Sequence, residues 1–145
     1  MSSAMVMEPL DNPPELMAPV LVYGSLKRGF ANHHWLAGAE TLGPATMAGL
    51  ALHDLGPFPM AVPDRDGSLL HGELYGVDAP LLARLDLLEG VPRLYRRQLH
   101  PLVGAGAAWV YLGRPSQVRH APRLEGGDWQ GPRAGRRTRP TPLPP

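Results

Sequence analysis

The 145-residue sequence contains no cysteine and no isoleucine, and Lys27 is its only lysine beside thirteen arginines. The absence of cysteine excludes a disulfide framework, thiolate metal sites and a cysteine nucleophile, and it is compatible with a reducing compartment. No apolar run approaches the roughly 18 residues that a membrane-spanning helix needs. These absences exclude several classes of secreted and membrane protein.

The N-terminal residues also lack the pattern of a secretory signal. Because the first basic residue is Lys27, the usual order of charged, apolar and small residues is missing. The length is that of one domain, which can bury roughly two-thirds of the surface of its unfolded chain. The sequence therefore predicts a soluble, cytoplasmic protein that folds without disulfide bonds or structural metal ions and has no membrane partner.

The net charge of +1 is distributed unevenly along the chain. Residues 1–18 carry a net charge of −3, residues 19–112 carry −1, and residues 113–145 carry +5. A basic tail can dock on nucleic acid. Residues 131–145, however, contain no aromatic residue to stack on bases and hardly any apolar residue to bury. We therefore interpret the tail as a solvated extension rather than a nucleic-acid site.

Three segments follow from the distribution of proline and apolar residues. A disordered leader is predicted over residues 1–18, one domain over residues 19–130, and a disordered Pro/Arg-rich tail over residues 131–145. Within the domain, strands are expected at 19–25, 46–55, 69–77, 94–103 and 106–113. A short helix is expected after Asn32 as its N-cap. Three prolines are expected to keep residues 56–68 irregular, and the Asp66-Gly67 turn predicts a hairpin or a near relative.

The clearest predicted helix covers residues 79–90. Its leucines recur at three-to-four-residue spacing, Asp78 stands at the N-cap position, Pro80 suits the first turn, and Gly90 suits the position after the C-cap. Many strands with one firm helix indicate a mixed α+β domain. We expect its strands to form a small mixed-strand β-barrel with one or two flanking helices.

The stretch VLVYGSLKRG at residues 20–29 runs an apolar strand into a glycine turn. A Walker phosphate loop is excluded because Phe30 and Ala31 follow Gly29, and the dinucleotide fingerprint is excluded because Leu26 replaces its second glycine. A strand that ends in glycine can still expose backbone N–H groups that bind an anion. Turn chemistry alone favours the simpler alternative, a tight turn without a ligand.

Glu89 occupies an unfavourable place at the end of the predicted helix. The negative end of the helix dipole disfavours a carboxylate by roughly 0.3–1 kcal/mol. That dipole and an apolar environment would raise the carboxyl pKa toward the range useful to a general base. The alternative is a surface glutamate paired with Arg93, Arg96 or Arg97, and the residues alone favour this alternative.

The other candidate residues give weaker evidence of a functional site. The six histidines lack metal-ligand spacing, and no metal or cofactor is predicted. Ser25 lacks the G-x-S-x-G surroundings of a hydrolase nucleophile. Trp109 is interpreted as a core residue and Tyr95 as a wall of a binding pocket.

Seven segments in a fixed order resemble the γ-glutamylcyclotransferase-like family. They are YGSLKRG, FPMAVP, HGELYGVD, LDLLEG, YRR, AWVYLGR and GDW, and the resemblance covers about residues 19–130. YGSLKRGFANH together with LDLLEG and YRR is similar to the γ-glutamylamine cyclotransferase branch. The middle of the chain and GDW resemble bacterial members of the family.

The resemblance implies a small barrel with a pocket at one mouth. It implies that Tyr23, Gly24, Ser25 and Leu26 bind the substrate, chiefly through backbone amides, and that Glu89 is the proton acceptor. The implied reaction cyclises the γ-glutamyl group of a γ-glutamyl amine or γ-glutamyl amino acid to 5-oxoproline and releases the amine, without metal or cofactor. The amides would hold either the α-carboxylate or the developing oxyanion. A non-catalytic ligand-binding member of the same fold is the alternative.

Overall fold

The computed structural model describes residues 17–104 and 106–132. The predicted leader and tail lie outside these residues, except for 17, 18, 131 and 132. The described residues form seven strands, one α-helix and two 3₁₀ helices. In chain order these are β1 Ala18–Val22, η3 His33–Leu36, β2 Glu40–Ala48, β3 Leu50–Asp54, β4 Pro59–Pro63, β5 Leu69–Val77, α2 Ala79–Leu88, β6 Arg96–Pro101, β7 Ala107–Leu112 and η4 Pro115–Val118.

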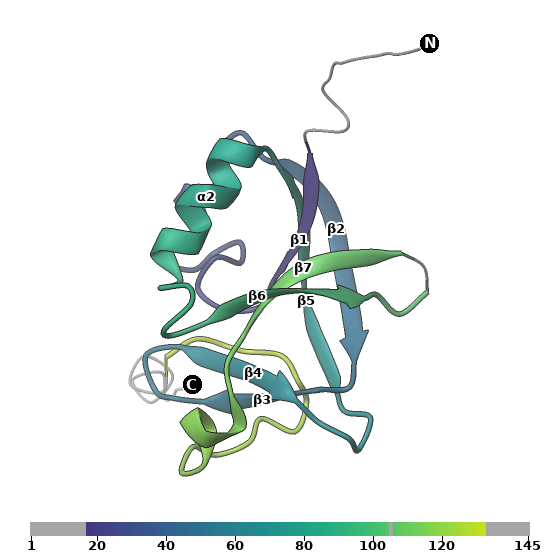
Figure 1. Cartoon of the computed structure of the whole chain (residues 1–145), viewed down its shortest axis with the longest axis vertical. Helices are drawn as coiled ribbons and strands as arrows, with labels where there is room; N and C mark the ends of the chain where they lie inside the picture. Colours follow the sequence, from purple (N-terminus) through teal and green to yellow (C-terminus); the bar gives the residue numbers. More distant parts are fainter. Residues whose placement is uncertain (1–16, 105, 133–145) are drawn as a thin grey trace.

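Five strands form one curled sheet in the order β2-β5-β1-β7-β6, and β3 and β4 form a separate pair (Figure 1). β1 lies at the centre, antiparallel to β5 and parallel to β7. The predicted closed barrel is wrong, because β2 and β6 do not pair as strands anywhere in the described residues. The chain leaves the large sheet at Gly49 (φ +81°), so β3 and β4 pair with each other instead of closing it. The mixed α+β class is confirmed.

The region from 46 to 68 differs most from the sequence-based expectation. The single strand expected at 46–55 is the end of β2 and the whole of β3, and residues 59–63 form β4 rather than irregular chain. Pro59 and Pro63 are tolerated because they occupy the two ends of β4 in a two-stranded ladder, where a missing N–H costs little. The hairpin expected at Asp66-Gly67 is also wrong, since β4 and β5 belong to different sheets.

Helix α2 begins and ends where its local signals predict. The Asp78 carboxylate accepts a hydrogen bond from the Leu81 N–H at 2.9 Å, and Gly90 follows the helix with φ +67°. The buried leucines Leu81 and Leu85 face the large sheet. The short helix after Asn32 is present as η3, and Asn32 occupies its N-cap position, but the Asn32 side chain makes no capping hydrogen bond.

β1 is buried on both faces, which explains its continuous apolar sequence. Val20 and Val22 belong to the hydrophobic cluster that includes leucines of α2. Leu21 belongs to a second cluster that includes Leu50 and Leu52 of β3. Because successive side chains of a strand point to opposite faces, both clusters meet at β1. The central strand is thus held firmly where it enters the YGSLKRG turn.

The segment after η4 returns along β3 and β5 (Figure 1). Asp54 and Leu124 donate backbone hydrogen bonds to the carbonyls of Pro122 and Leu52 at 2.8 Å each, and His71 donates to the Gly127 carbonyl at 2.8 Å. We call residues 121–132 the C-terminal strap. Glycine is required at 127, because a Cβ there would overlap the backbone of Leu69. No helix among the described residues is long and apolar enough to cross a membrane.

Candidate active site

A cavity of about 250 Å³ lies where β1 and α2 end. All six residues that were predicted as site residues line it, namely Tyr23, Gly24, Ser25, Leu26, Glu89 and Tyr95. The other lining residues are Leu21, Val22, Asn32, Phe58, Pro59, Leu88, Leu94 and Tyr111. Two segments about sixty residues apart therefore meet at one concave site.

Glu89 is the C-cap residue of α2, and its own N–H donates to the Leu85 carbonyl. Burial raises the pKa of the Glu89 carboxyl from 4.5 to about 7. Within the described part of the chain, this carboxyl has no hydrogen bond or ion pair to a basic side chain. Arg97 instead binds Asp86, with its Nε 2.8 Å from a carboxylate oxygen. The alternative of a surface ion pair for Glu89 is therefore wrong.

The YGSLKRG turn places backbone donors on the cavity. The carbonyls of Gly24 and Ser25 are occupied, because they accept hydrogen bonds from the N–H groups of Lys27 (3.0 Å) and Asn32 (2.9 Å). Among the described residues, we find no acceptor for the N–H groups of Gly24, Ser25 or Leu26. The segment is thus a tight turn whose residues carry unpaired N–H donors and line the same cavity as Glu89. Such donors suit a carboxylate or an oxyanion.

The hydroxyl groups of the three tyrosines at the cavity are committed to the protein. Tyr23 donates to the Tyr111 carbonyl (2.5 Å), Tyr95 donates to the Pro59 carbonyl (2.7 Å), and Tyr111 donates to an Asp86 carboxylate oxygen (2.8 Å). Burial and the nearby charge of Glu89 raise the pKa values of all three phenols, and hydrogen bonding and charge from Asp86 contribute at Tyr111. These tyrosines present neutral rings to a ligand.

Ser25 and Asn32 supply the remaining polar side chains at the cavity. The Asn32 amide Nδ2 donates to the Ser25 Oγ at 2.8 Å. No histidine contacts Ser25 by a hydrogen bond in the described part of the molecule, so nothing supports a serine nucleophile there. Asn32 was missed as a site residue, because its position before a short helix indicated only a cap.

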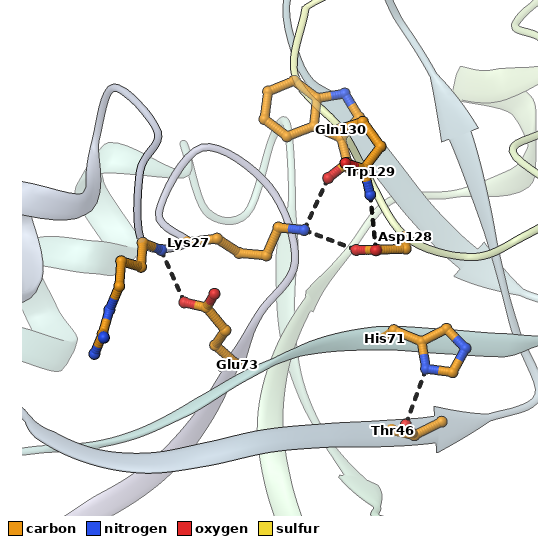
Figure 2. A network of polar contacts seen from close by, with 8 residues as sticks. Lys27, Thr46, His71, Glu73, Asp128, Trp129 and Gln130 are labelled. Atoms are coloured by element: carbon orange, nitrogen blue, oxygen red, sulfur yellow. Dashed lines mark hydrogen bonds and ion pairs between the residues drawn. The ribbon is translucent and has the colours of Figure 1, made fainter.

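Lys27 does not line the cavity, although it belongs to the YGSLKRG turn. Its side chain is buried and turns toward the C-terminal strap, where Nζ lies 2.9 Å from an Asp128 carboxylate oxygen and 2.8 Å from the Trp129 carbonyl (Figure 2). Only folding could reveal this contact, since the residues are about a hundred positions apart.

Two further expectations concern metal ions and Trp109. The described residues contain no group of three or more His, Asp or Glu side chains that could hold a metal ion. Trp109 is partly buried rather than a full core residue. Its ring lies under the Arg97 guanidinium, 4.4 Å from the ring centroid.

Comparison with known proteins identifies the family of this chain. Residues 20–131 match the family model described as gamma-glutamyl cyclotransferase, AIG2-like. The chain is 39% identical over 111 residues to the gamma-glutamylcyclotransferase family protein YtfP of Escherichia coli K12, covering 76% of this chain and 94% of that protein. It is 38% identical over 115 residues to gamma-glutamylaminecyclotransferase A of Danio rerio, covering 68% of this chain and 70% of that protein.

Solved structures show the same fold. An AIG2-like protein from Mus musculus aligns with a TM-score of 0.69 at 27% identity, covering 81% of this chain and 92% of that one. The solution structure of the Escherichia coli protein ytfP aligns with a TM-score of 0.57 at 40% identity, covering 77% and 95%. With its family match over most of the described residues and a shared fold, this chain belongs to the gamma-glutamyl cyclotransferase, AIG2-like family.

Proposed function

We propose that this protein cyclises the γ-glutamyl group of a γ-glutamyl amine to 5-oxoproline and releases the free amine. One observation carries the proposal. Glu89, whose carboxyl has no partner among the described residues and a pKa near 7, lines the same cavity as Gly24, Ser25 and Leu26, whose N–H groups are unpaired there. A base and an anion-binding set of donors are what this reaction requires.

The proposed reaction is an intramolecular acyl transfer. The α-amino nitrogen attacks the γ-carbonyl carbon, a new C–N bond closes the five-membered ring, and the amide bond to the leaving amine breaks. Glu89 takes a proton from the α-ammonium and returns it to the departing nitrogen. The ring nitrogen loses a second proton as it becomes the lactam N–H, and this proton converts the released amine to its ammonium form, so atoms and charges balance without water. Because the amine and the carbonyl belong to one substrate, the task of the protein is to hold the reactive conformer; a well-oriented intramolecular attack is worth about 7–11 kcal/mol relative to a bimolecular one. Proton transfer by Glu89 contributes about 10²–10⁴ in rate.

We assign the loop amides to the α-carboxylate of the substrate. This carboxylate is the permanent anion of a γ-glutamyl group, and none of the described lining residues is basic. The unpaired N–H groups of Gly24, Ser25 and Leu26 are therefore the donors best suited to it. The ammonium to be deprotonated would then face Glu89.

The hydrogen-bond donors of the cavity also restrict the chemical class of the leaving amine. With the loop amides used and the tyrosine hydroxyls donating within the protein, the described lining offers no cation for a second carboxylate, and Ser25 and Asn32 are its remaining side-chain donors. Phe58, Leu88, Leu94 and the Tyr95 ring supply apolar surface instead. A leaving amine without a carboxylate fits this lining better than an amino acid does, because an unpaired buried charge is costly.

The decisive experiment follows 5-oxoproline by mass spectrometry while the purified protein is incubated with a panel of γ-glutamyl amines and γ-glutamyl amino acids. Glu89→Gln keeps the size of the side chain and removes its basicity, so we expect a loss of about 10²–10⁴ in kcat. Glu125→Gln is the matched control, because the Glu125 side chain is 82% exposed and lies outside the cavity. Equal product release by the wild type and Glu89→Gln would reject Glu89 as the base. Binding of these ligands with no turnover would instead favour the non-catalytic alternative.

A further inference from the structure

Lys27 is the only cation that is buried among the described residues, with 7% of its surface exposed. Its Nζ donates to an Asp128 carboxylate oxygen at 2.9 Å and to the Trp129 carbonyl at 2.8 Å, and it lies 5.5 Å from the centroid of the Phe30 ring. Figure 2 shows the amine reaching from the YGSLKRG turn to the C-terminal strap. Burying an ammonium is costly unless its donors are satisfied, so these contacts define one position for the side chain.

The backbone of Lys27 belongs to the turn that presents the amides. Its N–H donates to the Gly24 carbonyl at 3.0 Å, and its carbonyl accepts from Phe30 at 3.1 Å. Leu26, whose N–H is one of the three unpaired donors, is its direct neighbour. A displacement of the Lys27 side chain would therefore be transmitted to the turn through two backbone bonds.

The strap is in turn anchored to the sheet and packed on the turn. The His71 N–H donates to the Gly127 carbonyl at 2.8 Å, one residue before Asp128. The Trp129 ring, 1% exposed, lies 5.1 Å from the Phe30 ring in a tilted arrangement. The hydrogen bond to β5 therefore fixes the position of the strap residues that Lys27 contacts.

We propose that Lys27 is a positioning residue that clamps the substrate-binding turn to the C-terminal strap and holds the Gly24–Leu26 amides in the geometry that binds the α-carboxylate. The inference rests on the proposed use of these amides in the reaction. Lys27 acts through the turn and touches no substrate. Because the carboxylate is bound equally in ground and transition states, loss of the clamp raises KM and leaves kcat nearly unchanged.

The test compares Lys27→Met with a matched control, Arg123→Met. Arg123 also anchors the strap through a charge, with its guanidinium 3.0 Å from an Asp64 carboxylate oxygen, but it contacts neither the turn nor the cavity. We expect Lys27→Met to raise KM for γ-glutamyl amines about tenfold, with kcat within about twofold, and Arg123→Met to change neither. Asp128→Asn, which removes the negative charge beside Nζ but keeps a side-chain oxygen and the Trp129 carbonyl as acceptors, should give a smaller rise in KM and covers the case in which Lys27→Met does not fold.

A second measurement tests the effect of Lys27 on the turn independently of catalytic activity. Backbone ¹H–¹⁵N spectra of the full chain report the Gly24, Ser25 and Leu26 amides directly, and titration with 5-oxoproline gives a Kd without turnover. Shifted amide signals in ligand-free Lys27→Met and a Kd for 5-oxoproline raised about tenfold would support the clamp. This result would hold even if the protein released no product; in that case only the proposed function would fail. Unchanged amides, an equal rise in Kd for Arg123→Met, or no binding of 5-oxoproline to the wild type would overturn the clamp.

Discussion

The hydroxyl of Tyr23 donates a hydrogen bond to the backbone carbonyl of Tyr111 at 2.5 Å, across 88 residues of sequence. The same oxygen accepts the Ala61 N–H at 3.1 Å. One phenol therefore joins the end of β1 to β7 and β4 at the wall of the cavity. The resemblance to the family assigns Tyr23 to substrate binding, and its hydroxyl is already fully used by the protein.

Replacing Tyr23 by phenylalanine should therefore lower stability more than substrate affinity. The change leaves the buried Ala61 N–H without its acceptor, which costs about 1–3 kcal/mol in the free energy of unfolding. KM should stay within about twofold, because the ring still forms the cavity wall. Urea unfolding and steady-state kinetics measure both effects. Tyr95→Phe is the control: it removes one bond to a carbonyl and should cost less.

The raised pKa of Glu89 predicts that stability falls as the pH rises. The folded state binds this proton more tightly than the unfolded state, where the pKa is near 4.5. Below about pH 4.5 the group is protonated in both states, and above about pH 7 the folded state holds a desolvated carboxylate. At about 1.4 kcal/mol per pKa unit, the free energy of unfolding should fall by roughly 3 kcal/mol across this window.

Glu89→Gln provides the comparison, since it carries no titrating group at this position. The difference in unfolding free energy between Glu89→Gln and the wild type should favour the variant at pH 8 and be small at pH 4.5. Denaturant unfolding at both values measures this difference and cancels the other titrating groups. A difference that does not depend on pH would contradict the raised pKa.

The activity should rise with pH in the same range. Only the ionised Glu89 carboxylate can accept the ammonium proton, so kcat/KM should increase with an apparent pKa near 7. The phenols of Tyr23, Tyr95 and Tyr111 face Glu89, and their raised pKa values keep them neutral in this range. A pH profile of initial rates checks this. A profile that is flat between pH 5 and pH 8 would be inconsistent with Glu89 as the base.

The lining of the cavity predicts a preference between two matched substrates. γ-Glutamyl-phenethylamide and γ-glutamylphenylalanine differ only by a carboxylate on the leaving amine. We expect kcat/KM to be at least about tenfold higher for the phenethylamide, because no described lining residue neutralises that carboxylate. Phe58→Arg would place a cation at the lining and should narrow the ratio. A wild-type preference for γ-glutamylphenylalanine would refute this assignment of the leaving group.

Trp129 provides a test of the strap as a structural element. Its indole Nε1 is buried without a hydrogen-bond partner in the described part of the chain, which costs about 1–3 kcal/mol. Trp129→Phe removes that donor and part of the packing, so these effects oppose each other and the net change should be within about 1–2 kcal/mol. Trp129→Ala should cost about 3–5 kcal/mol through the cavity it leaves. Thermal or urea unfolding of both variants gives the comparison.

Features that depend on neighbouring residues could be predicted from the sequence. Asp78, the leucine spacing and Gly90 predict α2 correctly because capping and periodicity act within one or two helical turns. The apolar run of β1 predicts a buried strand for the same reason. The position of Glu89 at a helix end could also be read from these local signals, and the resemblance to the family added the residues of the turn.

The way these segments meet depends on contacts that form only in the folded chain. The prolines of β4 predicted an irregular chain. In the structure, Pro59 and Pro63 lie at the two ends of β4, where a missing N–H costs little in the pairing with β3. Three features join residues that are far apart in the sequence. They are the curvature of the sheet, the cavity that Glu89 shares with the Gly24 turn, and the contact between Lys27 and Asp128. Burial of apolar surface brings such residues together, and it is a property of the whole packed chain that no local pattern encodes.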